Sequence, residues 1–439
     1  MSENDKENEN NLKNRIIDDN NNNYYFRNVK LNKMFIFISI ISIIIILGII
    51  IILIIVLNKD KNKKEKYICE EGEEDKCLIC ENNICIGCNP KYILENGICQ
   101  PKYSFKAIYE SIEDDENIQL IHKTFKDYII DIEIDDINVL NCTEYIFKTP
   151  GFHIVYILIN NSNLTSLEQL FENSNELISV NFTKGLNTTN IISISNMFNK
   201  CKKLISVNMY NINLQNIISM DYMFYGCQNL QLVEFPKNNA KSLITSTYTF
   251  FECNSLHYID ISFLKSKHLK NLEAIFYGCS TLKSIDLSVL DTENLINMKQ
   301  IFQNCISLKS INFANIKTNN LQDISSMFKS CKSLSSINMA NFNTANVINM
   351  ENLFNDCSSL TSINLSNFNT QKVTSMIYMF YDCINLSYVD ISHFKNNSLD
   401  KNYYFFNNKI PLKGIIKVNK NFIDIIKNYI PETWEIELI

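Results

Sequence analysis

Residues 341–370 read NFNTANVINMENLFNDCSSLTSINLSNFNT, and the tetrapeptide at the start of this stretch returns 26 residues later. The same interval spaces eight cysteines, each with a phenylalanine three residues before it and a leucine three residues after it. A fixed period of about 20 to 50 residues indicates a unit that cannot bury its apolar side alone and therefore stacks on its neighbours. The repeated positions, which we expect to form the core, are Phe198, Cys201, Phe224, Cys227, Phe250, Cys253, Phe276, Cys279, Phe302, Cys305, Phe328, Cys331, Phe354, Cys357, Phe380 and Cys383.

A single copy shows what each turn of the stack should contain. Apolar residues within 373–383 fall at helical spacing, which predicts a short helix or helical turn. Residues 386–391 then alternate apolar and polar side chains, which suits a short strand of a parallel sheet. The predicted fold class is therefore an α/β repeat solenoid, a stack of short parallel strands and helical turns.

The copy at residues 353–370 carries a family resemblance. Its residues LFNDCSSLTSINLSNFNT resemble the BspA-type leucine-rich repeats of bacterial and protist surface proteins, in their 26-residue class. The resemblance covers about residues 145–420. It implies a leucine-rich-repeat-like fold and surface display with adhesion or recognition, but no particular ligand, because repeat families share architecture and not function.

A membrane anchor is predicted before the repeats. Residues 34–57 form a run of 24 residues without a charge, and about 20 suffice for a transmembrane helix. A cleaved signal peptide is disfavoured because the run is too long and ends without a small-residue cleavage pattern. Lysines on the C-terminal side of the helix outnumber the basic residues before it, which alone favours a cytoplasmic C-terminus.

The cysteine-rich stretch that follows argues for the opposite orientation. Six cysteines within 31 residues, in a segment with almost no core of its own, are typical of a disulfide scaffold in an oxidising compartment. They are Cys69, Cys77, Cys80, Cys85, Cys88 and Cys99. Zinc is the alternative, but only four residues separate the two CxxC pairs. The stretch resembles growth-factor-receptor-like modules of extracellular proteins, and eight Asn-x-Ser/Thr sequons agree with exposure outside the cell.

These observations give the expected organisation of a plasma-membrane, single-pass protein with its N-terminus in the cytoplasm. The segments are a disordered tail (1–33), the transmembrane helix (34–57), a basic linker (58–68), the cysteine-rich disulfide module (69–99), an N-terminal cap (100–165), the solenoid (166–415) and a C-terminal cap (416–439). Strand-like runs at 128–134 and 154–159 belong to the first cap, and Trp434 is expected to cover the last apolar layer of the solenoid.

The cysteine column has three interpretations. A position between core phenylalanines and leucines suits a small apolar side chain, so packing is favoured over disulfides or a metal site within the column. Cys142 lies outside the column, and the total of 15 cysteines leaves at least one thiol unpaired in a monomer.

Outward positions of the predicted strands form the candidate binding face. Its residues are Asn208, Glu234, Tyr258, Asp260, Asp286, Asn312, Asn338, Asn364, Tyr388 and Asp390. Tyr258 and Tyr388 are the candidate anchors, because aromatic side chains supply much interface energy. The competing interpretation, which we favour, is a structural ladder of hydrogen-bonded Asn, Asp and Ser side chains.

Composition excludes several functions. A net charge of -6 without a basic patch argues against nucleic-acid partners. Five scattered histidines and the absence of nucleotide-binding or hydrolase motifs give no catalytic, cofactor or metal residues, although a triad assembled by the tertiary fold stays open. We therefore expect a protein that binds a protein or glycan ligand, with a self-associating coat protein or an intracellular membrane-tethered scaffold as alternatives.

Overall fold

The computed structural model describes residues 77–81, 84–88, 91–95, 98–395, 405–406, 411 and 413–439. They belong to one compact unit, Cys69–Ile439. The predicted tail, transmembrane helix and basic linker, together with Cys69, lie outside the described residues. Within the described part of the chain, no helix is long and apolar enough to cross a membrane.

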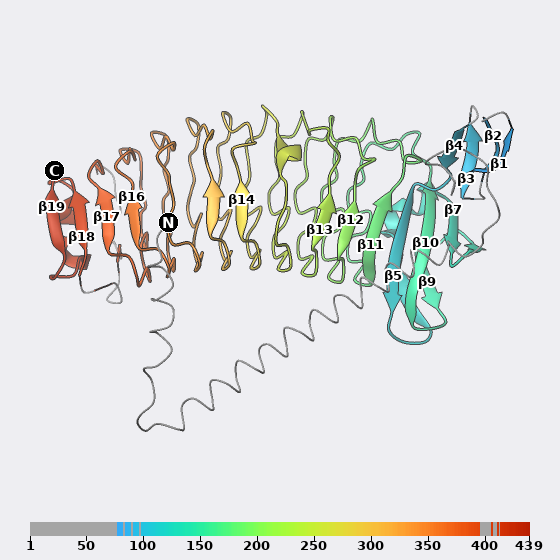
Figure 1. Cartoon of the computed structure of the whole chain (residues 1–439), viewed down its shortest axis with the longest axis horizontal. Helices are drawn as coiled ribbons and strands as arrows, with labels where there is room; N and C mark the ends of the chain where they lie inside the picture. The colour runs from blue at the N-terminus through green and yellow to red at the C-terminus, as the bar shows by residue number, and fades with distance from the viewer. Residues whose placement is uncertain are drawn as a thin grey trace, which may run out of the picture. The chain divides into compact units, whose positions relative to one another are not determined.

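Two antiparallel hairpins come first (Figure 1). Strand β1 (Cys77–Glu81) pairs with β2 (Ile84–Cys88), and β3 (Tyr92–Glu95) pairs with β4 (Ile98–Pro101). A disulfide joins Cys88 to Cys99, whereas the side chains of Cys77, Cys80 and Cys85 lie outside what is described. The ammonium of Lys91 lies 3.4 Å from Glu133 and 2.9 Å from Asp136, so it ties the second hairpin to the domain that follows.

That domain covers the first turn of the solenoid with an antiparallel sheet. Its elements are β5 (Phe105–Ser111), β6 (Glu116–Gln119), η3 (Lys123–Tyr128), β7 (Ile129–Ile134), β8 (Ile137–Val139), β9 (Glu144–Phe147) and β10 (Gly151–Ile159). Strand β5 pairs antiparallel with both β10 and β11 (Leu177–Phe182), and β11 begins the parallel series. One seven-stranded sheet therefore continues from the cap into the repeats and leaves no open edge where they meet.

The predicted solenoid is confirmed. Successive turns place residues 26 apart side by side, as in the pairing of Ser206 with Leu232 and of Val207 with Val233. Its strands are β12 (Ser206–Asn208), β13 (Leu232–Glu234), β14 (Ser284–Asp286), β15 (Ser310–Asn312), β16 (Ser362–Asn364) and β17 (Tyr388–Ile391), with the short helix η4 (Ser262–Leu264) between β13 and β14. A second parallel ladder of single bridges runs from Ser166 to Ser375 and marks nine turns.

The prediction of a short helix or helical turn in each repeat is wrong. Residues 373–383 form overlapping β-turns in which the Tyr381 N–H donates to Tyr378 O at 3.2 Å and the Cys383 N–H donates to Phe380 O at 3.3 Å. Tyr378 and Asp382 have φ angles of 58° and 59°, which a right-handed helix does not contain. The amide of Phe380 reaches the carbonyl of Phe405 instead of bonding within its own segment. The segment is thus a chain of turns that bonds the neighbouring coil.

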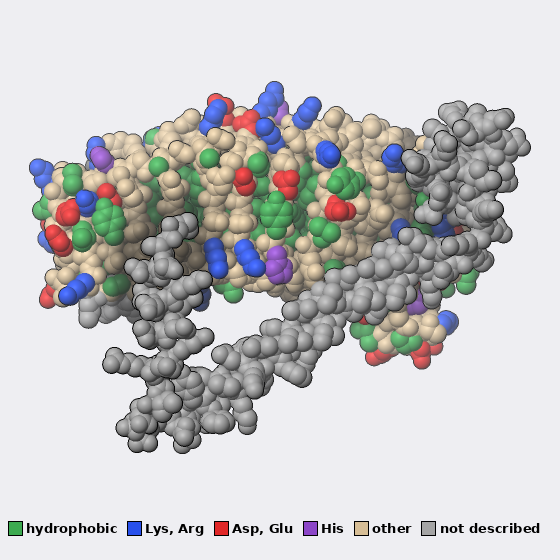
Figure 2. Space-filling view, viewed as in Figure 1, with side chains coloured by type: hydrophobic (Ala, Val, Ile, Leu, Met, Phe, Trp, Pro, Cys, Tyr) green, Lys and Arg blue, Asp and Glu red, His purple; other side chains and the backbone are tan. Residues whose placement is uncertain are grey.

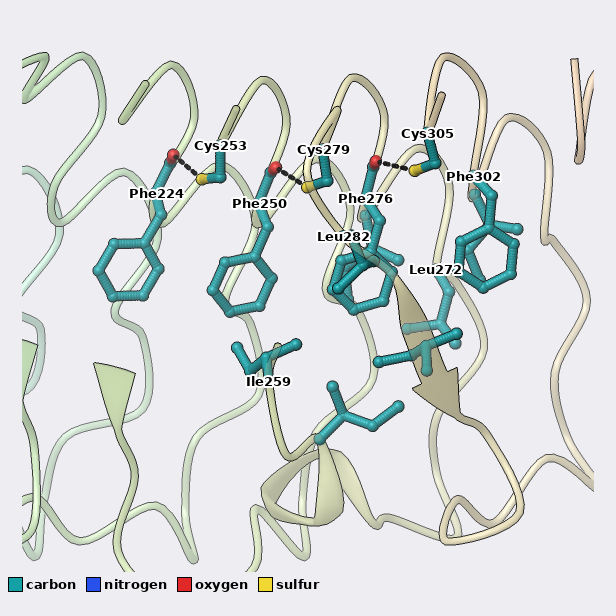
Figure 3. Packing of buried hydrophobic residues seen from close by; sticks show 14 of the residues in the cluster. Phe224, Phe250, Cys253, Ile259, Leu272, Phe276, Cys279, Leu282, Phe302 and Cys305 are labelled. Atoms are coloured by element: carbon teal, nitrogen blue, oxygen red, sulfur yellow. Dashed lines mark hydrogen bonds between the residues drawn. The ribbon is translucent and has the colours of Figure 1, made fainter. Parts of the chain in front are cut away.

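The core is a stack of identical slots (Figure 3). Each phenylalanine and cysteine of the repeat is buried. From Phe198 to Phe380, adjacent phenylalanine rings stack with centroids 5.1 to 6.1 Å apart and planes within 16° of parallel. Each thiol donates to the carbonyl oxygen of the phenylalanine in the preceding turn, as Cys253 does to Phe224 at 3.3 Å. The column is therefore core, with free thiols throughout.

The C-terminal end extends the same sheet. Strands β18 (Ile415–Val418) and β19 (Glu435–Leu438) add in parallel beyond β17, and α2 (Ile423–Ile426) with η5 (Lys427–Tyr429) connects them. Trp434 is buried between Gly414 and Phe406, and its indole N–H donates to Pro411 O at 2.7 Å. The last phenylalanine layer is thus covered by an aromatic ring whose polar atom has a partner.

Candidate binding surfaces

The strand face is the solvent side of the parallel strands, where the predicted binding residues lie. Tyr258 is the most exposed of them, with 69% of its surface accessible, and Tyr388 is half-buried. Asp390 is buried, at 9%. The remaining predicted residues are half-buried (Asn208, Glu234) or exposed (Asp260, Asp286, Asn312, Asn338, Asn364). The two tyrosines lie five turns apart and form no common anchor.

Most of the Asn and Asp column has a structural task. The side-chain oxygen of Asn338 accepts from the amide of Ala340 at 3.0 Å, and Asp260 does the same for Ser262 at 2.9 Å. Such Asx turns end the strand and turn the chain into the next corner. The same bond is made by Asn208, Asp286, Asn312, Asn364 and Asp390. The predicted ladder therefore acts mainly within each turn, although among the described residues Asn312 also reaches across, to Ser288 at 3.2 Å.

Charge on the strand face is arranged in two rows. The acidic row comprises Glu234, Asp260 and Asp286 in three successive turns, and the basic row comprises His257, Lys283 and Lys309. Leu232 and Tyr258, 52% and 69% exposed, lie between them. Figure 2 shows the rows as red side chains separated from blue and purple ones by a green band. The basic row was not predicted from the sequence, because each of its residues lies one position before the first outward residue of its strand.

A second surface, the turn face, carries an aromatic cluster of Tyr222, Tyr225, Tyr248, Phe251 and Tyr277. Tyr222 stacks on Tyr248 at 4.9 Å, Tyr225 on Phe251 at 4.6 Å, and Phe251 on Tyr277 at 4.4 Å. All five rings are partly exposed, Tyr222 most clearly at 37%. The cluster has a signal in the sequence, because aromatic residues recur five or two positions before successive cysteines. This pattern spans only three successive repeats and was not recognised beside the longer periodicity of Phe and Cys.

Acidic side chains border the aromatic cluster. The Tyr248 hydroxyl donates to Glu273 at 3.0 Å, and burial followed by this carboxylate raises the pKa of Tyr248 to about 12. Burial also raises the pKa of Tyr222, with Asp221 and Glu273 contributing. Both hydroxyls therefore stay protonated near neutral pH and remain hydrogen-bond donors.

One side-chain cluster in the N-terminal cap has the composition of a hydrolase triad. The Oγ of Ser111 lies 3.0 Å from Nε2 of His153, whose Nδ1 lies 2.7 Å from Asp135. The carbonyl oxygen of Thr149 lies 3.0 Å from the same Nε2 and also accepts from Ser111 at 2.9 Å. Both side chains are thus tied to the backbone of Thr149. With Ser111 and His153 buried, the cluster braces the 149–153 loop.

In the described residues, no three His, Cys, Asp or Glu side chains lie close enough together to hold a metal ion. Burial raises the pKa of the column thiols, so they stay protonated near neutral pH and act as hydrogen-bond donors. The pKa of the half-buried Cys142 is raised for the same reason.

The chain is similar to several solved structures at low identity. A leucine rich cell surface protein from Faecalibacterium prausnitzii is 14% identical with a TM-score of 0.22, and the match covers 64% of this chain and 84% of that one. A leucine-rich-repeat protein of Leptospira interrogans is 14% identical with a TM-score of 0.21, covering 56% and 75%. TLR13 in complex with ssRNA13 is 18% identical with a TM-score of 0.23, covering 53% of this chain and only 27% of that chain. No curated protein gives a significant match.

A family model does match the repeats. It aligns three times, at residues 158–257, 244–338 and 307–418, and the three alignments together span more than half of the chain. Their limits include all eight Phe and Cys slots of the solenoid core. The chain therefore belongs to the family described as Mycoplasma protein of unknown function, DUF285.

Proposed function

We propose that this protein recognises a protein ligand through the aromatic cluster of its turn face, and that it does so outside the cell, held by a membrane anchor at residues 34–57. The observation that carries the proposal is the presence of five partly exposed, mutually stacked aromatic side chains on three successive turns. Tyrosine is enriched at interface hot spots because it buries a large area with few rotatable bonds.

The geometry of the cluster favours a protein over a glycan. The rings lie nearly parallel, with 0° between Tyr222 and Tyr248 and 5° between Tyr225 and Phe251, so they cover much of each other's faces. A sugar packs on an open ring face, whereas this cluster offers ring edges and hydroxyl groups. Ring edges carry partial positive charge and suit aromatic, carbonyl and carboxylate groups of a protein partner.

Two observations support display outside the cell. A disulfide closes Cys88 to Cys99 within the cysteine-rich segment, and such bonds persist in oxidising compartments. The uncharged run at residues 34–57 has the length of a membrane span. The lysines after that run favour the opposite topology, so proteolysis of intact cells is the deciding measurement: loss of a C-terminal epitope supports display, and full protection contradicts it.

Ligand recognition is tested with a surface variant and a matched control. Tyr222→Ser with Tyr248→Ser removes the exposed edge of the cluster, whereas Tyr210→Ser changes a tyrosine that is 53% exposed elsewhere. We expect the full-length chain to bind target cells, the double variant to lose at least tenfold in affinity, and the control to bind normally. Equal binding by both variants, or no binding by the parent, contradicts the proposal. Binding abolished by protease treatment of the target cells supports a protein ligand, and binding abolished only by glycosidases contradicts it.

A further inference from the structure

We propose that the strand face is a homotypic interface, through which two copies of this chain pair face to face with their solenoids parallel. The two copies are related by a two-fold axis that runs along the stack of turns, over the line of Leu232, Tyr258 and Ser284. In the turns of Tyr258 and Ser284, the acidic residue of each copy then faces the basic residue of the other. This inference goes beyond ligand recognition and uses none of the residues of the aromatic cluster.

The two rows are parallel and separated by a constant distance. Within one turn, the acidic residue follows the basic residue by three positions, as Asp286 follows Lys283. At about 3.3 Å per strand residue, the rows lie roughly 10 Å apart. Within each row, successive charged residues lie one turn apart, which is about 4.8 Å. The strand face therefore carries a strip that is acidic on one side, basic on the other, and apolar along the middle at Leu232 and Tyr258.

These charges lack ionic partners in the folded chain. Within the described part of the chain, Glu234, Lys283 and Lys309 form no ion pair, and Asp286 accepts only from neighbouring hydroxyl, amide and backbone groups. The His257 ring lies 2.8 Å from the carbonyl oxygen of Ser255 and forms no ion pair within the described residues. By contrast, other exposed lysines do find carboxylates, as Lys317 finds Glu293 at 3.3 Å. The rows are thus available to a partner.

Symmetry determines which partner suits the strip. A two-fold axis along the stack exchanges the two sides of the strip and keeps each turn opposite the same turn of the other copy. Asp286 then faces the partner copy's Lys283, Asp260 faces its His257, and Tyr258 meets Tyr258 near the axis. An axis along the strands would instead place acid against acid. An isologous interface needs such a self-complementary patch, and this strip has the pattern.

The flanks of the strip are compatible with this pairing. Next to the charged turns the outward positions are neutral and small, with Ser336, Asn338, Ser362 and Asn364 on one side and Ser206 with Asn208 on the other. The turn after Asn364 carries the half-buried Tyr388 and the buried Asp390. Burying the neutral positions adds no further charge, while Glu234 and Lys309, at the two ends of the rows, face the polar Gln231 and Asn312 of the other copy. Nine turns at about 4.8 Å by roughly 15 Å of strand give roughly 600 Å² per copy, near the about 800 Å² of a standard interface. Parallel copies also begin at the same end, as two anchors in one membrane require.

Charge exchange between copies tests the pairing. Asp286→Lys makes both rows basic at this turn and Lys283→Asp makes both acidic, so each variant repels itself and attracts the other. We expect the purified full-length chain, at constant detergent, to dimerise reversibly in analytical ultracentrifugation, and each single variant to dimerise at least tenfold more weakly. An equimolar mixture of the two variants should recover the parental association. Lys270→Asp, at an exposed lysine that belongs to neither charged row, is the matched control and should leave dimerisation unchanged.

Cysteine cross-linking tests the position of the axis. Ser284→Cys places a thiol on the predicted axis and Gln300→Cys places one on the turn face, while the column thiols are buried. Under mild oxidation we expect a covalent dimer from Ser284→Cys and none beyond the parental level from Gln300→Cys. The inference is overturned by a monomeric parent, by variants that associate only with themselves, or by equal cross-linking at both positions. A normal dimer that binds no target cells would contradict only the proposed ligand recognition.

Discussion

The thiol of Cys279 donates a hydrogen bond to the carbonyl oxygen of Phe250, one turn earlier in the stack, at 3.1 Å. The same oxygen accepts from the backbone amide of Cys253, also at 3.1 Å. Both lone pairs of a fully buried carbonyl are thereby used, once within a turn and once between turns. Because the arrangement repeats along the column, each thiol must keep its proton for the fold to stay intact.

Alkaline solution should therefore destabilise the protein steeply. Burial raises the pKa of the eight column thiols above their ordinary value near 9.0, so the unfolded chain releases protons that the folded chain retains. Stability is fully present below pH 9 and falls as pH rises above it, by about 1.4 kcal/mol per pH unit for each thiol. Urea unfolding between pH 7 and 10 measures this slope. A Cys279→Ala, Cys305→Ala variant should release two fewer protons, and a flat profile for the parent would refute the account.

Glycine at a left-handed turn position should stabilise the fold. Ser326 has a φ of 54°, its amide donates to Glu351 O at 2.7 Å, and its hydroxyl makes no hydrogen bond within the described residues. An L residue there costs about 1 kcal/mol relative to glycine, so Ser326→Gly should raise the urea midpoint and Ser326→Val should lower it. A helix would give the opposite result for glycine, which makes the sign of the shift a direct test of the β-turn segment.

Four equivalent threonines, Thr292, Thr318, Thr344 and Thr370, are buried in successive turns and should contribute to cohesion between turns. The Thr344 hydroxyl accepts from the amide of Asn369 at 2.8 Å and donates to the carbonyl of the same residue at 3.0 Å. Thr344→Val keeps the shape and leaves both backbone groups without this partner, which should cost about 1 to 3 kcal/mol of unfolding free energy. The exposed Thr361, whose hydroxyl bond is 3.5 Å long, is the control. Equal losses of stability from Thr344→Val and Thr361→Val would show that the buried threonine hydroxyls do not hold the turns together.

Gly414 should tolerate no side chain. A Cβ at this position would lie 2.5 Å from the Trp434 ring and 2.8 Å from Ser387 O, so Gly414→Ala must displace the tryptophan. We expect a loss of about 1 to 3 kcal/mol, a typical cost of overpacking, and a red shift in the emission of the single tryptophan. Lys413→Ala, at an exposed neighbouring position, should change neither quantity. An unshifted emission spectrum in Gly414→Ala would show that Trp434 is not packed there.

Periodicity predicted the stack and its core, because burial recurs at the same slots whatever the local backbone does. It did not predict the backbone between them. The apolar spacing in residues 373–383 fits a helix and also fits overlapping β-turns that point the same side chains inward. The deciding quantity is the sign of φ at Tyr378 and Asp382, and residues as different as Tyr, Ala and Ser occupy the equivalent positions in other turns. Neighbouring coils impose that conformation through hydrogen bonds that a single copy cannot reveal.

Surface prediction failed for a different reason. The sequence places Asp260 and Asn338 in one outward column, but an Asx turn already uses the amide oxygen of Asn338 and one of the two carboxylate oxygens of Asp260. The acidic and basic rows arise only when residues three positions apart are compared across neighbouring turns. The aromatic cluster likewise depends on contacts such as that of Phe251 with Tyr277, which joins two copies. Surface features that form only between neighbouring coils cannot be predicted from the sequence of a single copy.

Every coil presents the same amides, carbonyls and apolar slots to the next coil in the same order. The 26-residue repeat is therefore a modular unit of the fold and of the gene that encodes it. Removing one whole unit from the middle, for example residues 306–331, would join Cys305 to the residue that normally follows Cys331 and restore all contacts at the seam. Removing a few residues more or fewer would misalign every later coil. Length variants among relatives should therefore differ by complete units, as unequal recombination between such copies would produce.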